Sequence, residues 1–269
     1  MADGNLGEMS FWDHVDALRG VLLRAGAVVL LMAIVFFAAM PEIFDRIILA
    51  PTRSDFCLYG LLASLGSARG ITPDFNAAFS VSLINIQLAS QFFIHISTSF
   101  WLALVFSFPI IIYLLWSFVA PGLYEREKRG ARTAFLFGNV MFFIGVAVGY
   151  FLVFPLTLRF LAGYQVSELV PNQISLDSYM DNFLMLILVM GIIFELPLLA
   201  WLLGKTGLLT RSFFSSYRRH AVVVLLILAA VVTPTGDPFT LTVVFLPIYI
   251  LWELSARFVP SHSHDTAAA

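Results

Sequence analysis

The chain alternates long apolar runs with short charged turns, and this alternation restricts its fold more than any other feature. Of its 269 residues, 60% are hydrophobic and 12% are charged, and the mean hydropathy is +0.91. An ordinary soluble domain carries about 25% charged residues and cannot bury so much apolar surface. Helices that face lipid can expose it, because their backbone groups are bonded internally. The sequence therefore predicts an all-α membrane protein.

Six apolar segments are predicted to be transmembrane helices. A helix needs about 20 residues to cross about 30 Å of hydrocarbon. The first four segments meet this length, whereas the last two are short, and Pro247 is expected to break the sixth. A tight turn at 233–238 would join the last two as a helical hairpin. The predicted spans are residues 20–40, 97–120, 132–155, 183–203, 221–232 and 239–258.

The positions of lysine and arginine predict the orientation. If the N-terminus is cytoplasmic and the six spans alternate, 11 of the 15 cations face the cytoplasm and 4 face the exterior. Both termini are then cytoplasmic, and residues 41–96 form a long exterior loop whose apolar patch at 57–62 suggests a partly structured cap. We expect one transmembrane domain over residues 1–258 and a disordered tail at 259–269.

The turn at residues 118–129 must lie in water at a membrane face, because long apolar runs flank it. Its glutamates and cations can therefore meet a soluble partner. The net charge of the chain is −2 and no basic face runs along it, so nucleic acid is not an expected partner.

An amphipathic segment precedes the first span. Phe11, Val15, Leu18 and Leu22 recur at helical spacing and form one apolar stripe, which predicts an interfacial helix leading into the membrane. The acidic Asp16 falls outside the stripe. The segment is therefore either a plain anchor or a docking helix with acidic groups at the membrane surface.

Glu195 lies inside the fourth apolar run, two residues before Pro197. An ionised acid at the centre of a membrane costs about 2.5–3.5 kcal/mol, so we expect it to face protein or water. Pro197 removes a backbone donor and should open the helix near position 193. Three roles remain open for Glu195: a structural hydrogen bond, a contact with a partner helix, or a proton site.

Other sequence signals concern packing and chemistry. Gly145 and Gly149 have the GxxxG spacing that permits close helix approach. The sequence contains no HExxH, GxSxG or Walker motif, and His14, His95 and His220 are far apart in the chain. We therefore expect no enzymatic activity, no cofactor and no metal.

Several motifs together resemble the TatC family, the multi-span receptor subunit of the Sec-independent twin-arginine protein translocase. The resemblance covers about residues 10–258. Its motifs are Leu18-Arg19, Ala50-Pro51, Trp116-x-Phe118-x-Ala120-Pro121-x-Leu123-Tyr124-x-x-Glu127, Phe194-Glu195-x-Pro197, Thr233-Pro234 and Asp237-Pro238.

The resemblance implies a receptor in the bacterial plasma (inner) membrane that binds Arg-Arg signal peptides of folded proteins at its cytoplasmic face. It also implies single-span TatA and TatB-type partners, self-association within the lipid bilayer, and export driven by the proton-motive force. The implied residues are Glu127, Arg129, Asp16, Leu18, Arg19, Phe118 and Pro121 for the signal peptide, Glu195 for a partner helix, and Pro51 and Asp237 for an exterior-side role.

The chain departs from the family pattern at two positions. Ala17 stands where the family commonly has Glu, and Leu241 stands where a Gln is expected. A proton-coupled transporter of small solutes, with Glu195 as the proton relay, is the alternative function. An intramembrane enzyme is a weaker alternative, because the spans lack a catalytic pair.

Overall fold

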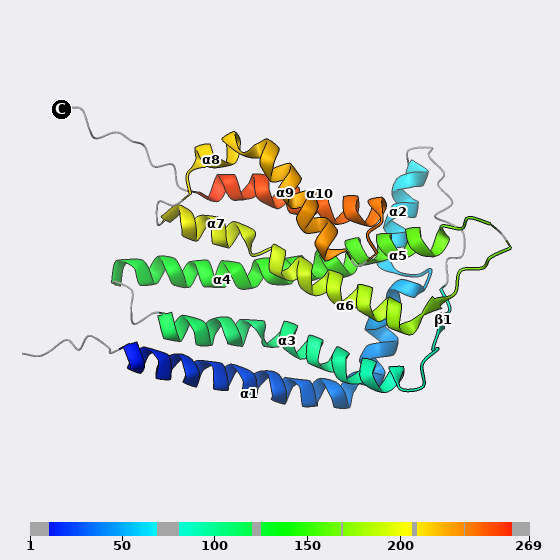
Figure 1. The fold of residues 1–269 in the computed structure, drawn as a ribbon, viewed down its shortest axis with the longest axis horizontal. Helices are drawn as coiled ribbons and strands as arrows, with labels where there is room; N and C mark the ends of the chain where they lie inside the picture. Colours follow the sequence, from blue (N-terminus) through cyan, green and yellow to red (C-terminus); the bar gives the residue numbers. More distant parts are fainter. Residues whose placement is uncertain are drawn as a thin grey trace, which may run out of the picture. The chain divides into compact units, whose positions relative to one another are not determined.

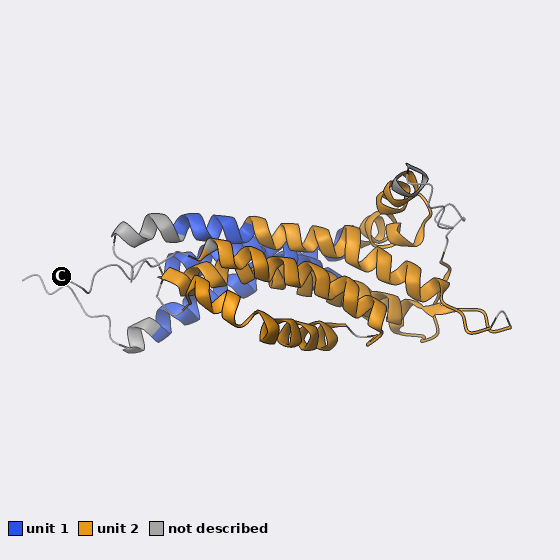
Figure 2. Ribbon diagram, turned by 90° about the horizontal axis from the view of Figure 1, so that it is seen from above, with its two compact units in different colours: residues 1–39, 97–139 blue, residues 40–96, 140–269 orange. Residues whose placement is uncertain are grey.

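The structure is a computed structural model that describes residues 11–68, 81–119, 125–167, 169–205, 209–233 and 235–259. Within these ranges, side chains are described except at 11–14, 65–68, 119, 125–131 and 258. The chain forms two compact units, residues 1–39 with 97–139 and residues 40–96 with 140–269 (Figure 2). The predicted domain at 1–258 covers both units, and the predicted disordered tail lies outside the described residues from 260 onward.

Unit 1 contains most of α1 (Phe11–Ile43), most of α3 (Ser90–Val119) and the first part of α4 (Glu125–Val148). The predicted interfacial segment and first span form one continuous helix, α1. Phe36 of α1 and Phe106 of α3 contact each other, with ring centroids 5.1 Å apart. Most large apolar side chains of α1 are exposed, among them Leu30 and Leu31. Exposed apolar side chains along a whole helix are typical of a surface that faces lipid.

Unit 2 begins with the end of α1 and holds the remaining helices (Figure 1). Helix α10 packs against α7, α9 and α5, and α6 packs against η5. The bounds are η1 (Phe44–Ile48), η2 (Ala50–Thr52), α2 (Cys57–Ala68), η5 (Gly149–Val153), α5 (Phe154–Gly163), α6 (Leu176–Ile193), α7 (Leu196–Lys205), α8 (Arg211–Ser216), α9 (Arg218–Val232) and α10 (Pro238–Phe258). The core of this unit includes Phe142, Phe154, Tyr179 and Met190, each with almost no exposed surface.

The predicted exterior loop at 41–96 contains regular structure. Helix α2 begins at Cys57 and includes the apolar patch of the sequence. Further along, β1 (Leu83–Ile84) pairs in parallel with β2 (Ile174–Ser175), with Leu83 opposite Ile174. This two-stranded pair could not be predicted from the sequence, because two residues are too few to show an alternating pattern.

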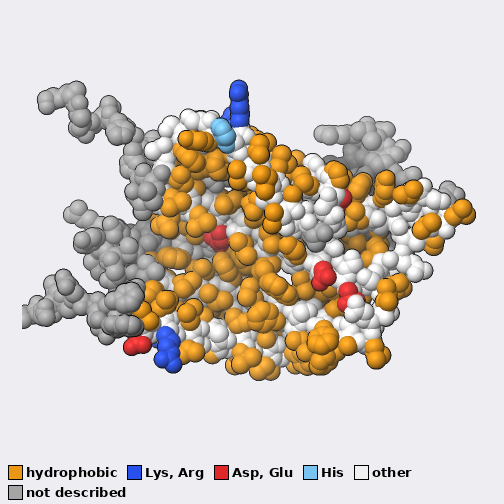
Figure 3. Space-filling view, in the orientation of Figure 1, with side chains coloured by type: hydrophobic (Ala, Val, Ile, Leu, Met, Phe, Trp, Pro, Cys, Tyr) orange, Lys and Arg blue, Asp and Glu red, His pale blue; other side chains and the backbone are white. Residues whose placement is uncertain are grey.

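Five helical segments of the described ranges are long and apolar enough to cross a membrane. Helix α9 has 15 residues and is short, as predicted. The expected break at Pro247 is wrong, because α10 continues through it for 21 residues. The prediction that the sixth helix is short is therefore also wrong, since α10 is long enough to cross a membrane. A membrane helix tolerates proline, since leaving the helical form would expose several backbone groups to hydrocarbon instead of one. Hydrophobic side chains cover most of the face seen in Figure 3.

Candidate functional site

The predicted docking residues of α1 are accessible. Asp16, Leu18 and Arg19 are all exposed on a continuous helix, whereas Ala17 is half-buried. Asp16 and Arg19 are three residues apart, so they lie on neighbouring positions of one helix face. This face offers a carboxylate and a guanidinium to a ligand, and the exposed side chain of Leu18 adds apolar surface.

The charged turn connects α3 to α4. Helix α3 ends at Val119 and α4 begins at Glu125, so Glu127 and Arg129 lie in the first turns of α4. Their side chains, and the whole of Pro121, lie outside the described part of the structure. Phe118 is half-buried in the last turn of α3. Acidic residues at a helix N-terminus interact favourably with the helix dipole, which helps α4 to begin here.

Glu195 lies in a break between two helices, as Pro197 predicts. Helix α6 ends at Ile193 and α7 begins at Leu196. The backbone amide of Glu195 donates to the carbonyl of Ile192 at 3.0 Å. Its side chain is half-buried, and its Oε1 atom is buried without a hydrogen-bond partner among the described residues. A buried carboxyl oxygen without a donor is costly.

Glycines hold the helix before Glu195 close to α4 and η5. A Cβ atom on Gly145 would lie 2.5 Å from the carbonyl oxygen of Met190 and 2.7 Å from the Cβ of Phe194. A Cβ on Gly191 would lie 2.9 Å from the ring of Phe142. These distances confirm the predicted close packing at the GxxxG spacing. The same packing fixes the position of Phe194, the residue before Glu195.

On the predicted exterior side, three tyrosines bond the chain segment that contains Pro51. The hydroxyl of Tyr59 donates to the carbonyl of Pro51 at 2.9 Å. The hydroxyl of Tyr150 donates to the carbonyl of Ile47 at 2.8 Å, and that of Tyr179 donates to the carbonyl of Ile48. Pro51 itself is buried. These contacts satisfy carbonyls that the irregular end of α1 leaves free, so they hold Pro51 in place.

Asp237 caps the N-terminus of α10. Its Oδ1 accepts from the amide of Thr240 at 2.7 Å, and its Oδ2 accepts from the hydroxyl of Thr235 at 2.6 Å. Partial burial raises the pKa of Asp237, but the hydrogen bonds to its ionised form outweigh burial and hold the pKa below its ordinary value of 3.8. Gly236, which precedes it, has a φ of +60°, a conformation that favours glycine. Asp237 therefore shapes the turn between α9 and α10.

An ion pair between α9 and α10 was not predicted from the sequence. Arg218 lies 2.7 Å from a carboxylate oxygen of Glu253, and the hydroxyl of Tyr249 donates to the other oxygen at 3.0 Å. The sequence signal was only that an acid falls near the end of an apolar run. The pair gives Glu253 a structural partner within unit 2.

The fold and these sites define a multi-pass helical membrane protein. A model of the family "Sec-independent protein translocase protein (TatC)" matches residues 13–247. The chain therefore belongs to the TatC family of Sec-independent protein translocase proteins.

Curated relatives carry the same name. The chain is 33% identical over 250 residues to the TatC protein of a Blattabacterium from Periplaneta americana. The alignment covers 92% of this chain and 94% of that protein. It is 39% identical over 178 residues to TatC of Helicobacter pylori, and that alignment covers 66% of this chain and 70% of the relative.

Solved structures agree with this membership. A crystal structure named "Twin Arginine Translocase Receptor- TatC" matches with a TM-score of 0.67 and 26% identity, over 91% of this chain and 97% of that one. The structure of such a receptor in DDM matches with a TM-score of 0.71 and 27% identity, over 92% of this chain and 99% of that one. The chain is thus a component of the twin-arginine translocase and not a catalytic enzyme.

Proposed function

We propose that this chain is the receptor that binds Arg-Arg signal peptides of folded proteins at the cytoplasmic face of the bacterial inner membrane. Its membership of the TatC family carries the proposal, and a matching solved structure is named a twin-arginine translocase receptor. The excess of cations in the predicted cytoplasmic loops supports six spans with both termini in the cytoplasm.

The signal's arginine pair would bind between the charged turn and α1. A guanidinium fork suits a carboxylate, and Glu127 and the exposed Asp16 provide one each. Arg129, Arg19, Leu18, Phe118 and Pro121 would shape the surface around them. Ala17 stands where the family commonly has Glu, so Asp16 would supply the second carboxylate.

Carboxylates alone cannot provide the affinity. A well-placed charged hydrogen bond contributes about 1.5–3 kcal/mol, and an exposed ion pair contributes about 0–1 kcal/mol. Micromolar binding needs about 8 kcal/mol. The turn also carries more cations than acids. The apolar part of the signal peptide must therefore bury surface against the exposed side chains of the receptor or in lipid, while Glu127 selects for arginine.

Partner subunits would bind at Glu195. Its carboxyl oxygen is buried without a hydrogen-bond partner among the described residues, and the helix break exposes part of the residue. A polar side chain on a single-span TatA or TatB-type helix would supply the missing donor. Further copies of this chain would associate with it, and the proton-motive force would drive export. Pro51 and Asp237 would stabilise the exterior side of the receptor.

Export in cells tests the proposal. A Glu127→Lys variant should lose export of an Arg-Arg substrate, because it places a cation where the signal's guanidinium must bind. Glu125→Lys is the matched control, since it makes the same charge change two residues earlier in the same helix. We expect the control to export normally and both variants to insert normally. Normal export by Glu127→Lys would refute the site, and equal loss in both variants would assign the effect to net charge.

A further inference from the structure

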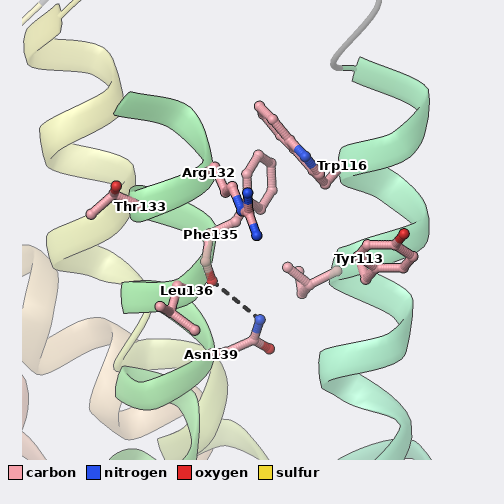
Figure 4. A pocket seen from close by; sticks show the side chains of 8 residues that line it. Tyr113, Trp116, Arg132, Thr133, Phe135, Leu136 and Asn139 are labelled. Carbon is pink, nitrogen blue, oxygen red and sulfur yellow. Dashed lines mark hydrogen bonds between the residues drawn. The ribbon is translucent and has the colours of Figure 1, made fainter. Parts of the chain in front are cut away.

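A pocket of about 600 Å³ lies within unit 1, between α3 and α4 (Figure 4). Its volume falls within the usual range of sites for small molecules. Arg132 lies at its wall, in the third turn of α4, and the distribution of cations in the sequence predicts that this end of α4 lies at the cytoplasmic surface. The lining residues are Ile112, Tyr113, Trp116, Arg132, Thr133, Phe135, Leu136 and Asn139.

The chemistry of the lining changes with depth. The guanidinium of Arg132 points into the space between the two helices (Figure 4). Asn139 follows seven residues later on α4, about 10 Å further along the helix axis. Ile112 and Leu136 add apolar surface. A cation beside apolar side chains matches the charged head and apolar tails of a phospholipid.

Aromatic side chains line the pocket beside Arg132. Trp116 packs on Phe135 with ring centroids 5.1 Å apart, and exposed Tyr113 stands beside it. Tryptophan and tyrosine at this level are typical of contacts with lipid headgroups.

We infer that this pocket binds an anionic phospholipid, such as phosphatidylglycerol. The phosphate would bind the guanidinium of Arg132, and an acyl chain would lie along Ile112 and Leu136. Arg126, Lys128 and Arg129 precede Arg132 in the sequence, and such basic clusters attract anionic lipids.

Charge complementarity favours the lipid over a signal peptide. Arg132 would repel the arginine pair of a signal, and a purely apolar peptide segment would leave its guanidinium without an anion. The inference goes beyond the proposed function, because it stands on the pocket alone and holds whether or not Glu127 binds a signal peptide.

Native mass spectrometry of the full chain, extracted from vesicles of equal phosphatidylglycerol and phosphatidylcholine, tests the site. Arg132→Gln should lower the retained ratio of phosphatidylglycerol to phosphatidylcholine about tenfold. Arg219→Gln removes an exposed cation of α9 with the same charge change, and it should alter the ratio by less than about twofold. Arg132→Lys should retain most of the preference. Equal ratios in the two glutamine variants would overturn the proposal.

Photocrosslinking locates the lipid without altering Arg132. A photoreactive residue in place of Tyr113 should form adducts with phosphatidylglycerol, and one in place of the exposed Val224 on α9 should show no preference between the lipids. The absence of lipid adducts at 113 would overturn the proposal. So would displacement of the lipid by millimolar inorganic phosphate, which would indicate a phosphate site, or by an Arg-Arg signal peptide, which would indicate a peptide site.

Discussion

Replacing Gly145 by alanine should destabilise the protein, although alanine is the better helix former. The new Cβ would lie 2.5 Å from the carbonyl oxygen of Met190, whereas ordinary contact begins at 3.4 Å, so the helices must separate by about 0.9 Å. A backbone oxygen cannot rotate away as a side chain can. Overpacking of this kind costs about 1–3 kcal/mol, and here it should cost about 2–3 kcal/mol because the Cβ of Phe194 also lies only 2.7 Å away. The helix preference of alanine returns about 1 kcal/mol. We expect a net loss of about 1–2 kcal/mol.

Gly26→Ala is the matched control, because a Cβ at Gly26 in α1 meets no atom within 4 Å. It should stabilise by about 0.5–1 kcal/mol. At about 2–4 °C per kcal/mol, the two variants should differ by about 3–12 °C in the unfolding temperature in detergent, measured by tryptophan fluorescence. If Gly145→Ala raises the unfolding temperature as Gly26→Ala does, the helices are not in close contact there and the packing argument fails.

Three further changes probe other sites. Tyr59→Phe should cost about 1–3 kcal/mol of stability in thermal unfolding, because it removes a buried hydrogen bond to Pro51, whereas Tyr164→Phe at an exposed position should have no effect. Glu195→Leu should abolish copurification of single-span partners while Glu195→Gln retains part of it, and full copurification with Leu would refute the contact. The pKa of Asp237 is lowered in the folded protein, so its stabilising effect is present above pH 3.8 and is lost as the pH falls below that value. An Asp237→Ala variant should therefore show a smaller loss of unfolding temperature on acidification than the wild type, and an equal loss would contradict the capping role.

Local rules predicted the features that depend on a few neighbouring residues. Pro197 lacks a backbone donor, and α6 ends at Ile193 as expected. The GxxxG spacing of Gly145 and Gly149 predicted close packing, and both lie against α6. The same rule failed at Pro247, because the membrane favours a continuous helix at the cost of one hydrogen bond.

Contacts between distant residues could not be predicted in this way. Tyr150 and Tyr179 donate to carbonyls 103 and 131 residues away, and nothing in the sequence pairs them. The pairing of β1 with β2 and the ion pair of Arg218 with Glu253 depend likewise on tertiary packing. For the candidate site, single motifs indicated the residues, but only the fold showed that Pro51 is held by a tyrosine and that Asp237 is a helix cap.

Direct binding measurements test the selection of arginine by Glu127. Fluorescent signal peptides with Arg-Arg or Lys-Lys pairs would be titrated against the purified chain in nanodiscs, as wild type and as Glu127→Gln. We predict an Arg-Arg preference of about tenfold in the wild type, which falls to about onefold in the variant while Lys-Lys affinity changes little. An unchanged Arg-Arg preference in Glu127→Gln would show that Glu127 does not select for arginine.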